Sequence, residues 1–366
     1  MGDSPEFIKL LYYPLMDPFS QAVVGATFAS TSADKTSIRP IILAGALAGM
    51  AADLDVLINS ATDPLLFLEY HRQFTHSLLF VPIGAALVAL ALWPFFKRRL
   101  TSKQLFIACF LGYLSHGLLD ACTTYGTQLL WPITDHRFAW HLISIIDPLF
   151  TLPLAVALVW AMIALKPFAA QRLALFWMLA YLSLGEIQRQ RAVDAGYELA
   201  ESRGHMPTRL EAKPGFAQLI LWKIVYEWDG HFYVDGVRTA FDINYYPGDR
   251  IRKIDAEWAN RVLPPKSQIR RDFDRFRWFS NDYLALDTEQ DNLVIDVRYS
   301  MNVRDIRPLW GVLFDLEAPQ KHVQYLTFRS MDQQTLDTFW QMLAGHPEAH
   351  LPKPLIFNQP LNSRSP

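Results

Sequence analysis

Histidine and aspartate side chains that could bind a metal ion gather at or beside the ends of apolar runs in the N-terminal half. They are Asp53, Asp55, His71, His76, His116, Asp120, His136, His141 and Asp147. Ionisable groups next to membrane segments are costly, so their default interpretation is functional. Imidazole and carboxylate groups without a nearby thiolate pair suit zinc first, with manganese and iron as open alternatives. We therefore expect a divalent metal site, with His136 as its weakest candidate because its surroundings also suit an exposed loop.

The spacing of these residues indicates how each pair is placed. His116 and Asp120 are four residues apart, so on a helix they share one face and can reach the same ion. Asp53 and Asp55 are two residues apart and cannot share a helix face, which suits the end of a helix. Taken one at a time, such residues are more often solvated or paired than bound to metal. Their position at one end of several segments favours the joint interpretation.

A second motif, YHRQFTHS, holds His71 and His76, which are five residues apart and require a loop or a helix start. Arg72 lies in the same motif, and Arg137 lies between the fourth and fifth apolar runs. Guanidinium groups bind phosphate well, so both arginines are candidates to bind an anionic substrate. The alternative for them is ordinary pairing at the membrane interface.

Long apolar runs must position these residues. The clearest, Ser77 to Phe96, has no charge over twenty residues and is long enough to cross about 30 Å of hydrocarbon. The other runs cover approximately residues 18–31, 38–52, 104–119, 142–165 and 173–184. Buried helices of a soluble protein are the alternative, but six successive runs disfavour it. We expect a mostly α-helical, polytopic membrane bundle of about five to six hydrophobic helices, the first two close-packed through Gly and Ala.

Basic residues between the runs orient the predicted bundle. They fall in three short connections on one side, as Lys35 and Arg39, as Lys97, Arg98 and Arg99, and as Lys166 and Arg172. Such loops stay in the cytoplasm, so the His and Asp residues belong to the opposite face. We predict a multi-pass protein of a bacterial inner membrane, with the metal site and the C-terminal domain on the outer, periplasmic face.

The composition divides the chain into regions. We expect an N-terminal extension over 1–15, a membrane domain over 16–190, an extramembrane α+β domain over 191–351 and a Pro-rich tail over 352–366. Asp229-Gly230 between apolar runs predicts a hairpin turn. The net charge of -2 and the lack of a long basic block indicate no nucleic-acid partner.

Four segments together resemble a known family. They are Met16 to Ala22, Ala52 to Asp55, Tyr70 to Ser77 and Ser115 to Gln128, and Ile146 to Leu149 continues the match. They resemble the YdjM-like membrane-bound metal-dependent hydrolases, also called LexA-binding inner membrane-associated hydrolases. The resemblance is dense over about 16–190. Many members carry Thr-His where this chain has Ser20-Gln21.

The resemblance implies a distant similarity to zinc-dependent phospholipase C and P1-type nucleases, and hence a helical metal site and phosphoester hydrolysis. It implies metal ligands among Asp53, Asp55, His71, His76, His116 and Asp120. The soluble enzymes also use a free N-terminal amine and a later His-x-x-x-Glu. This chain lacks a good match to that motif, and His141 and Asp147 are candidate substitutes.

The resemblance, together with the predicted metal site, thus implies a hydrolase that cleaves a phosphoester of a lipid or lipid-linked headgroup with metal-activated water. Asp55, His76 and Asp120 are the candidate catalytic residues, with Asp55 the first candidate for a free general base. One alternative is a membrane protein that binds metal without catalysis, in a structural or regulatory role. Another is an ion carrier, which is disfavoured because the polar residues stop at one face.

Overall fold

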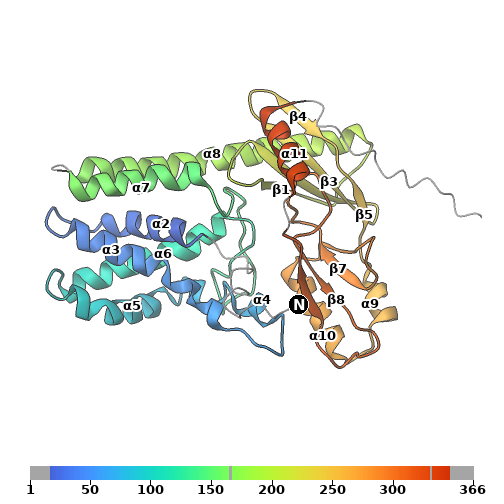
Figure 1. The fold of residues 1–366 in the computed structure, drawn as a ribbon, viewed down its shortest axis with the longest axis horizontal. Coiled ribbons are helices and arrows are strands. Elements are labelled where there is room, and N and C mark those ends of the chain that lie inside the picture. Colours follow the sequence, from blue (N-terminus) through green and yellow to red (C-terminus); the bar gives the residue numbers. More distant parts are fainter. Residues whose placement is uncertain (1–16, 165–166, 330–331, 347–366) are drawn as a thin grey trace, which may run out of the picture.

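The computed structural model describes residues 17–164, 167–329 and 332–346. The predicted N-terminal extension, the Pro-rich tail and Lys166 lie outside these residues. A bundle of long helices and a C-terminal domain of sheets and short helices lie side by side, and one long helix, α8, extends from the first into the second (Figure 1).

Six long helices and three short ones build the described part of the N-terminal half. The long helices are α2 (Pro18–Ser30), α3 (Ile38–Gly49), α5 (Val81–Phe96), α6 (Ser102–Cys122), α7 (Pro148–Ile163) and α8 (Pro167–Ser202). The short ones are the 3₁₀ segments η1 (Ala51–Leu57) and η2 (Phe74–His76) and the helix α4 (Leu66–Tyr70). All three short segments lie between α3 and α5, at the end of the bundle that faces the C-terminal domain (Figure 1).

Capping residues fix where three of these helices begin. The Asp17 side chain accepts hydrogen bonds from the backbone N–H groups of Phe19 and Ser20 at the start of α2. Thr101 and Gln104 form a reciprocal capping box at the start of α6. Asp147 caps α7. Each cap satisfies N–H groups that have no partner inside the helix.

Small residues let α2, α3 and α6 pack closely, as predicted for the first two. A Cβ atom on Gly45 would collide with the Ala29 side chain and the Gly25 carbonyl oxygen. A Cβ atom on Gly112 of α6 would collide with the Gly45 carbonyl oxygen. The backbones of three helices therefore approach at Gly45, which brings the ends of α3 and α6 together.

The described helices include fewer clear membrane spans than the sequence predicted. By length and composition, three are long and apolar enough to cross a membrane, Ile38–Leu57, Ser102–Cys122 and Pro167–Ser202. The pair Leu66–His76 and Val81–Phe96, bent by 84°, makes a fourth if it is one span. Helix α7 is a shorter apolar helix, so the expected five to six spans are not confirmed.

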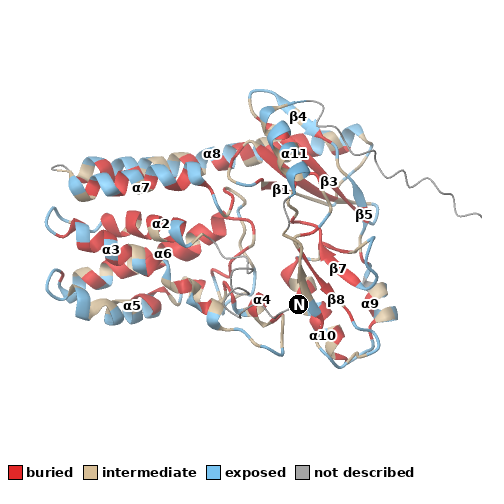
Figure 2. Ribbon diagram, in the orientation of Figure 1, coloured by how far each residue is buried: buried red, intermediate tan, exposed pale blue. Residues whose placement is uncertain are grey.

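Apolar side chains cover the outward faces of the bundle. Figure 2 shows exposed residues along α5 and α7, where Leu90 is 72%, Phe95 77% and Val156 68% exposed. Contiguous exposed apolar faces of this kind are rare on soluble monomers and suit contact with lipid. Because lipid can cover these faces, the bundle fits the predicted membrane environment.

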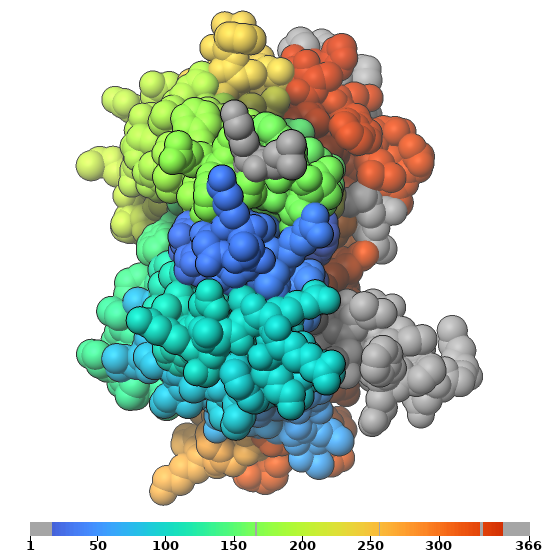
Figure 3. Space-filling model, turned by 90° about the vertical axis from the view of Figure 1, so that its left-hand side faces the viewer, coloured from blue at the N-terminus to red at the C-terminus, as the bar shows by residue number. Residues whose placement is uncertain are grey.

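The basic residues lie at the end of the bundle away from the C-terminal domain. Figure 3 looks onto this end, with the α2–α3 turn in blue, α5 and α6 in cyan, and α7 and α8 in green. Lys35 lies in the first turn and Lys97 to Arg99 lie between α5 and α6. The cationic residues and the His/Asp residues thus occupy opposite ends, as the sequence predicted.

Within the residues that the structure describes, two antiparallel sheets and three helices form the C-terminal domain. The first sheet has the order β1-β2-β3-β4 with β5 also paired to β3, and the second has the order β6-β7-β8-β9. The strands are β1 (Arg209–Pro214), β2 (Leu221–Trp228), β3 (His231–Thr239), β4 (Ile243–Tyr246), β5 (Arg250–Arg252), β6 (Leu284–Leu286), β7 (Leu293–Asp296), β8 (Trp310–Leu313) and β9 (Gln324–Thr327). The helices are α9 (Ala256–Val262), α10 (Gln268–Phe279) and α11 (Gln333–Ala344). Asp229 and Gly230, both with positive φ, form the turn between β2 and β3, which confirms the predicted hairpin.

The two halves are joined by a continuous helix and by a shared apolar cluster. Helix α8 continues without a break through the predicted boundary at residue 190. Phe67 and Leu68 of α4 are buried in one apolar cluster with Phe273, Phe276 and Trp310 of the C-terminal domain. The predicted domains are therefore joined by a common core beside α4, which places the C-terminal domain over the His/Asp end of the bundle.

Candidate metal centre

The elements at this end of the bundle bring the predicted residues together. Asp53 and Asp55 lie on η1 directly after α3, and His76 is the last residue of η2. His116 and Asp120 lie one turn apart on α6. The single face that the sequence predicted is thus formed by segments from three separate parts of the chain.

Four side chains form the candidate metal centre: Asp53, His76, His116 and Asp120. His116 Nε2 lies 2.9 Å from His76 Nε2 and 3.2 Å from Asp53 Oδ1. His76 Nε2 lies 3.4 Å from Asp53 Oδ1 and 3.2 Å from Asp120 Oδ2. His116 Nε2 and Asp120 Oδ2 are 3.9 Å apart. Ligand atoms about 2.0–2.1 Å from a tetrahedral zinc ion are about 3.4 Å apart, so these separations fit one ion.

Hydrogen bonds on the far sides of the two rings fix their tautomers. His116 Nδ1 is 2.5 Å from the Gly49 carbonyl oxygen, which can only accept, so Nδ1 carries the proton. The Thr75 hydroxyl donates to Asp55 Oδ2 at 2.7 Å, so its oxygen accepts from His76 Nδ1 at 2.9 Å. In both neutral rings Nε2 then carries a lone pair.

This arrangement needs a positive charge between the rings. Two Nε2 lone pairs lie 2.9 Å apart beside two carboxylate oxygens, Asp53 Oδ1 and Asp120 Oδ2, which have no hydrogen-bond donor among the described residues. Four electron-pair donors at such distances repel one another unless a metal ion, or an added proton on one Nε2, lies among them. Two imidazoles and two carboxylates are a donor set that suits zinc, manganese or iron. The residues present therefore fit a divalent metal ion.

Asp55 contacts the Nδ1 atoms of the His71 and His76 rings. Its Oδ1 lies 2.7 Å from His71 Nδ1, and its Oδ2 accepts from the Arg72 backbone N–H and the Thr75 hydroxyl. Its Oδ2 is also 3.2 Å from His76 Nδ1. A carboxylate behind a metal-binding histidine orients the ring and makes it a stronger ligand. The free general base predicted for Asp55 does not match these contacts, because both of its oxygens already accept hydrogen bonds.

A second group overlaps the first. Asp53, Asp55 and His71 can place their ligand atoms within 4.8 Å of one another. His71 Nε2 is buried and has no hydrogen-bond partner in the described part of the chain. The hydrogen bond from Nδ1 to Asp55 leaves Nε2 as a lone pair, so His71 can serve a second ion next to the first.

Arg72 contacts the candidate metal centre at Asp120. Its φ of 66° lies in the left-handed region, which is strained for a side chain of this size and concentrates at functional sites. Hydrogen bonds hold this conformation, from the Arg72 N–H to Asp55 and from the Gln128 N–H to the Arg72 carbonyl. The guanidinium Nε lies 3.2 Å from Asp120 Oδ2 as an ion pair.

Two polar residues at the centre were not singled out as site residues by spacing. Thr75 links His76 to Asp55, as described above. Gln21 of α2 donates from Nε2 to Asp120 Oδ1 at 2.8 Å, and its own Oε1 is buried without a hydrogen-bond partner among the described residues. Gln21 lies far from the other site residues in the sequence, and only its place in the family motif marked it.

His141 and Asp147 are not in either group. His141 Nε2 lies 3.5 Å from the Lys213 ammonium, and burial together with that ammonium lowers the pKa of His141 well below its usual value. Asp147 accepts hydrogen bonds from the Tyr181 hydroxyl while it caps α7. His136 is exposed in the connection between α6 and α7. These residues follow α6 by more than a dozen positions, so helix spacing could not place them.

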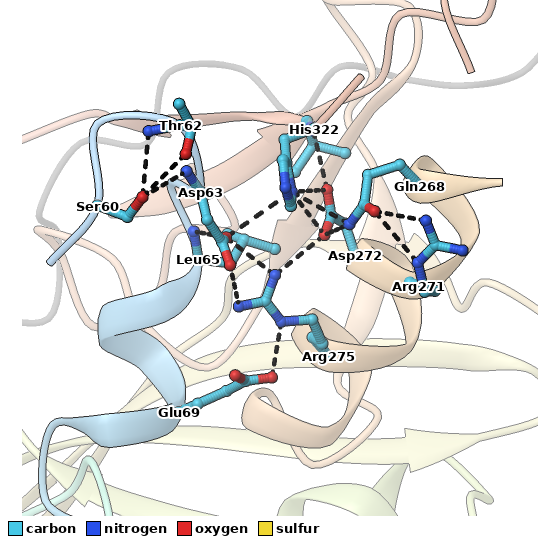
Figure 4. A network of polar contacts seen from close by, with 11 residues as sticks. Ser60, Thr62, Asp63, Leu65, Glu69, Gln268, Arg271, Asp272, Arg275 and His322 are labelled. Atoms are coloured by element: carbon cyan, nitrogen blue, oxygen red, sulfur yellow. Dashed lines mark hydrogen bonds and ion pairs between the residues drawn. The ribbon is translucent and has the colours of Figure 1, made fainter. Parts of the chain in front are cut away.

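A third group of ligand-type residues joins the two halves (Figure 4). We call Asp63, Glu69, Asp272, Arg275 and His322 the Arg275 network. Arg275 donates to both Asp63 oxygens at 2.9 Å, to Glu69 at 2.6 Å and to Asp272 at 3.1 Å. His322 Nδ1 lies 3.0 Å from Asp272 Oδ2. No sequence pattern indicated this group, because its members come from distant segments.

Fold and site define a multi-pass membrane protein whose His/Asp cluster can hold a metal ion. Residues 16–192 match the family model described as YdjM inner membrane protein. The match covers slightly less than half of the chain, and residues 16–192 are therefore similar to that family of inner membrane proteins.

Two curated relatives cover parts of the chain. It is 35% identical over 109 residues, 29% of its length, to "Inner membrane protein YbcI" of Escherichia coli, strain K12. It is 25% identical over 128 residues, 35% of its length, to "Uncharacterized protein YfhP" of Bacillus subtilis, strain 168. The chain spans 62% and 38% of the lengths of these two proteins. No solved structure matches the chain.

Proposed function

We propose that this protein is a membrane-bound, metal-dependent hydrolase that cleaves a phosphoester of a lipid or lipid-linked headgroup. The observation that carries the proposal is the pair of imidazole Nε2 atoms 2.9 Å apart, with their protons held on Nδ1. Such an arrangement is built to receive a cation. When bound, a divalent ion of this kind lowers the pKa of water and supplies hydroxide at neutral pH.

The residues of the site have separable roles in this proposal. Asp53, His76, His116 and Asp120 hold the ion, and Asp55 orients His76 and His71. Arg72 neutralises Asp120 and keeps one nitrogen, Nη2, without a hydrogen-bond partner among the described residues. A guanidinium nitrogen so close to the centre can bind a phosphoryl oxygen and stabilise negative charge that develops there.

The proposed location is the periplasmic face of the inner membrane. The basic residues at the opposite end of the bundle support it, since basic loops stay in the cytoplasm. The centre also lies at the ends of the apolar helices, so a bilayer that covers these helices would bring its headgroups close to the centre (Figure 1). A lipid phosphoester would reach this depth without leaving the bilayer.

The burial of the centre favours one alternative, a metal ion with a structural role. His76, His116 and Asp120 are all buried, and only the Asp53 side chain is accessible, at 15%. Structural metal sites are closed, whereas catalytic sites keep a position open for water. In this alternative the ion would stabilise the joint between η1, η2 and α6 without any reaction.

One substitution series separates these functions. We expect the full chain, purified in detergent, to carry stoichiometric metal by elemental analysis and to hydrolyse phosphoester substrates. His116→Ala should lose most of the metal and the activity, because the ring supplies a ligand. His136→Ala, an exposed histidine, is the matched control and should keep both. Stoichiometric metal without hydrolysis would support the structural role, and full metal in His116→Ala would refute the centre.

A further inference from the structure

Two neighbouring turns of the C-terminal domain each carry an exposed phenylalanine. Phe216 lies in the turn between β1 and β2 and is 54% exposed, and Phe241 lies in the turn between β3 and β4 and is completely exposed. The Thr239 backbone N–H donates to the Ile220 carbonyl oxygen at 2.6 Å, so the two turns lie side by side. Single exposed apolar residues are common on any protein, so the position of this pair decides what it can contact.

Helix α8 holds the β3–β4 turn close to its own surface. Gln188 Nε2 donates to the Thr239 carbonyl oxygen at 2.8 Å. The Arg191 guanidinium donates to the carbonyl oxygens of Thr239 and Ala240 at 2.9 and 2.6 Å. Phe241 follows Ala240 directly, so it is attached to α8 within one residue of these hydrogen bonds.

The attachment point lies where the surface of α8 changes from apolar to polar. On the bundle side, α8 exposes Leu184 and Ile187. The next four residues, 188–191, are Gln-Arg-Gln-Arg. A helix that crosses a bilayer changes in this way where it passes from hydrocarbon to headgroups. Lipid that covers the apolar faces of the bundle up to Ile187 therefore ends at the level of the β3–β4 turn.

The β1–β2 turn is fixed against the same end of the bundle. Leu219 of this turn is buried in one apolar cluster with Phe150, near the start of α7. The Ala217 backbone N–H donates to the Ser144 hydroxyl, in the segment before α7, at 3.0 Å. Phe216 precedes these contacts, so its turn cannot move away from the bundle without exposing the Leu219 side chain.

The β3–β4 region extends sideways beyond the bundle. Figure 3 looks along the bundle from its basic end, and the yellow part of the chain, which includes the turn between β3 and β4, projects past the green helices α7 and α8. Figure 1 shows the same region beyond α8 on one side of the molecule. Lipid beside the bundle, and not the bundle itself, would therefore face this part of the domain.

We propose that the two turns, residues 215–220 and 239–243, form a membrane-contact edge of the C-terminal domain, with Phe216 and Phe241 inserted between the lipid headgroups. Apolar side chains at this depth gain free energy by leaving water for the boundary between headgroups and acyl chains. The partner is the bilayer around the bundle, because the edge continues the apolar surface of α8. This inference does not depend on metal binding or hydrolysis.

Fluorescence quenching by lipid tests the membrane-contact edge. The full-length variants Phe241→Cys and Phe216→Cys are labelled with the fluorophore NBD and reconstituted into vesicles of phosphatidylethanolamine and phosphatidylglycerol. Some of the lipid carries a nitroxide near the headgroup end of its acyl chain. We expect this lipid to quench both labels at least twofold more strongly than a label in Met206→Cys. The unchanged protein, whose two cysteines are buried, is the control for labelling.

Met206 is the matched control because it is also highly exposed, at 83%, but lies toward the far end of α8. The His205 N–H bonds to the Ala200 carbonyl oxygen, and Ala200 is about 14 Å beyond Arg191 at 1.5 Å per residue. Iodide in the aqueous phase should show the reverse order and quench the label at Met206 most. Lipid quenching at either phenylalanine position no stronger than at Met206 would overturn the edge. Protection of both positions from nitroxide lipid and from iodide would also overturn it, and would indicate contact with a second copy of the chain.

Discussion

The candidate metal centre and the Arg275 network both gather histidine and carboxylate groups at ligand-like distances, and both lie near the boundary between the halves. In the Arg275 network a guanidinium already supplies hydrogen bonds to Asp63, Glu69 and Asp272. In the candidate metal centre the hydrogen-bond partners assign the protons of the neutral rings to the outer nitrogens, so that lone pairs meet inside. Histidine and carboxylate groups that lie close together are therefore a weaker sign of a metal site than the positions of the protons on those groups.

The two regions also differ in what they join. The candidate metal centre links elements of the N-terminal half, namely η1, η2 and α6. The Arg275 network links the segment around α4 to α10 and His322 of the C-terminal domain (Figure 4). The first arrangement suits an ion and its chemistry, and the second suits a fixed joint that keeps the C-terminal domain over the centre.

The largest expected difference between the two regions is in metal affinity, measured after an aspartate in each region is replaced by asparagine. We expect Asp55→Asn to weaken metal binding about 10–100-fold, because the carboxylate behind His76 is lost. Asp63→Asn in the Arg275 network should leave metal affinity unchanged. Competition against a calibrated chelator measures both. Equal loss in the two variants would mean that the Arg275 network also binds metal.

The next effect concerns stability. Arg275→Ala leaves three carboxylates without their cation, and Asp272 among them is fully buried. Because the other partners are partly exposed, we expect a loss of about 1–3 kcal/mol, less than for a completely buried pair. Thermal or denaturant unfolding in detergent measures it, with metal content unchanged. Arg271→Ala on the same helix is exposed and should cost less than about 0.5 kcal/mol.

The smallest effect is a pH dependence of the Arg275 network. Burial alone would raise the pKa of Asp63, but the hydrogen bonds and charge of Arg275 outweigh it and lower the pKa. A carboxyl with a lowered pKa in the folded state stabilises the fold above its unfolded pKa of about 3.9, and this contribution is lost as pH falls through the folded value. Unfolding measured below about pH 4 should therefore show a loss of stability that Arg275→Ala lacks. If the free energy of unfolding falls identically with pH in both proteins, Asp63 does not contribute to the stability of the joint.

Local patterns in the sequence were sufficient for several features. His116 and Asp120 share a face because four residues make about one helical turn, and the structure places both in the centre. Glycine and alanine in the first two runs predicted the close approach of α2 and α3. The hairpin at Asp229-Gly230 followed from turn chemistry. Each of these depends on neighbours within a few positions, which is the range that a sequence pattern describes.

Contacts between residues that are far apart in the sequence were not predicted. His141 was expected near the ion, but the connection after α6 turns it toward Lys213. Asp55 was expected to be free, but the fold of the segment 71–76 brings His71 and Thr75 into contact with it. The expected five to six membrane spans were not confirmed, and apolar runs alone do not reveal where helices bend or end.

The sequence by itself determined the apolar helices, the end of the bundle that carries histidine and aspartate, and the basic end opposite to it. Only the tertiary structure decided that His76 and His116, forty residues apart, meet through Nε2, and that Arg137 packs against the aromatic rings at the end of α10. The physical reason is that hydropathy and helix spacing act along one element. The meeting of side chains depends on how the loops and the C-terminal domain pack against that element.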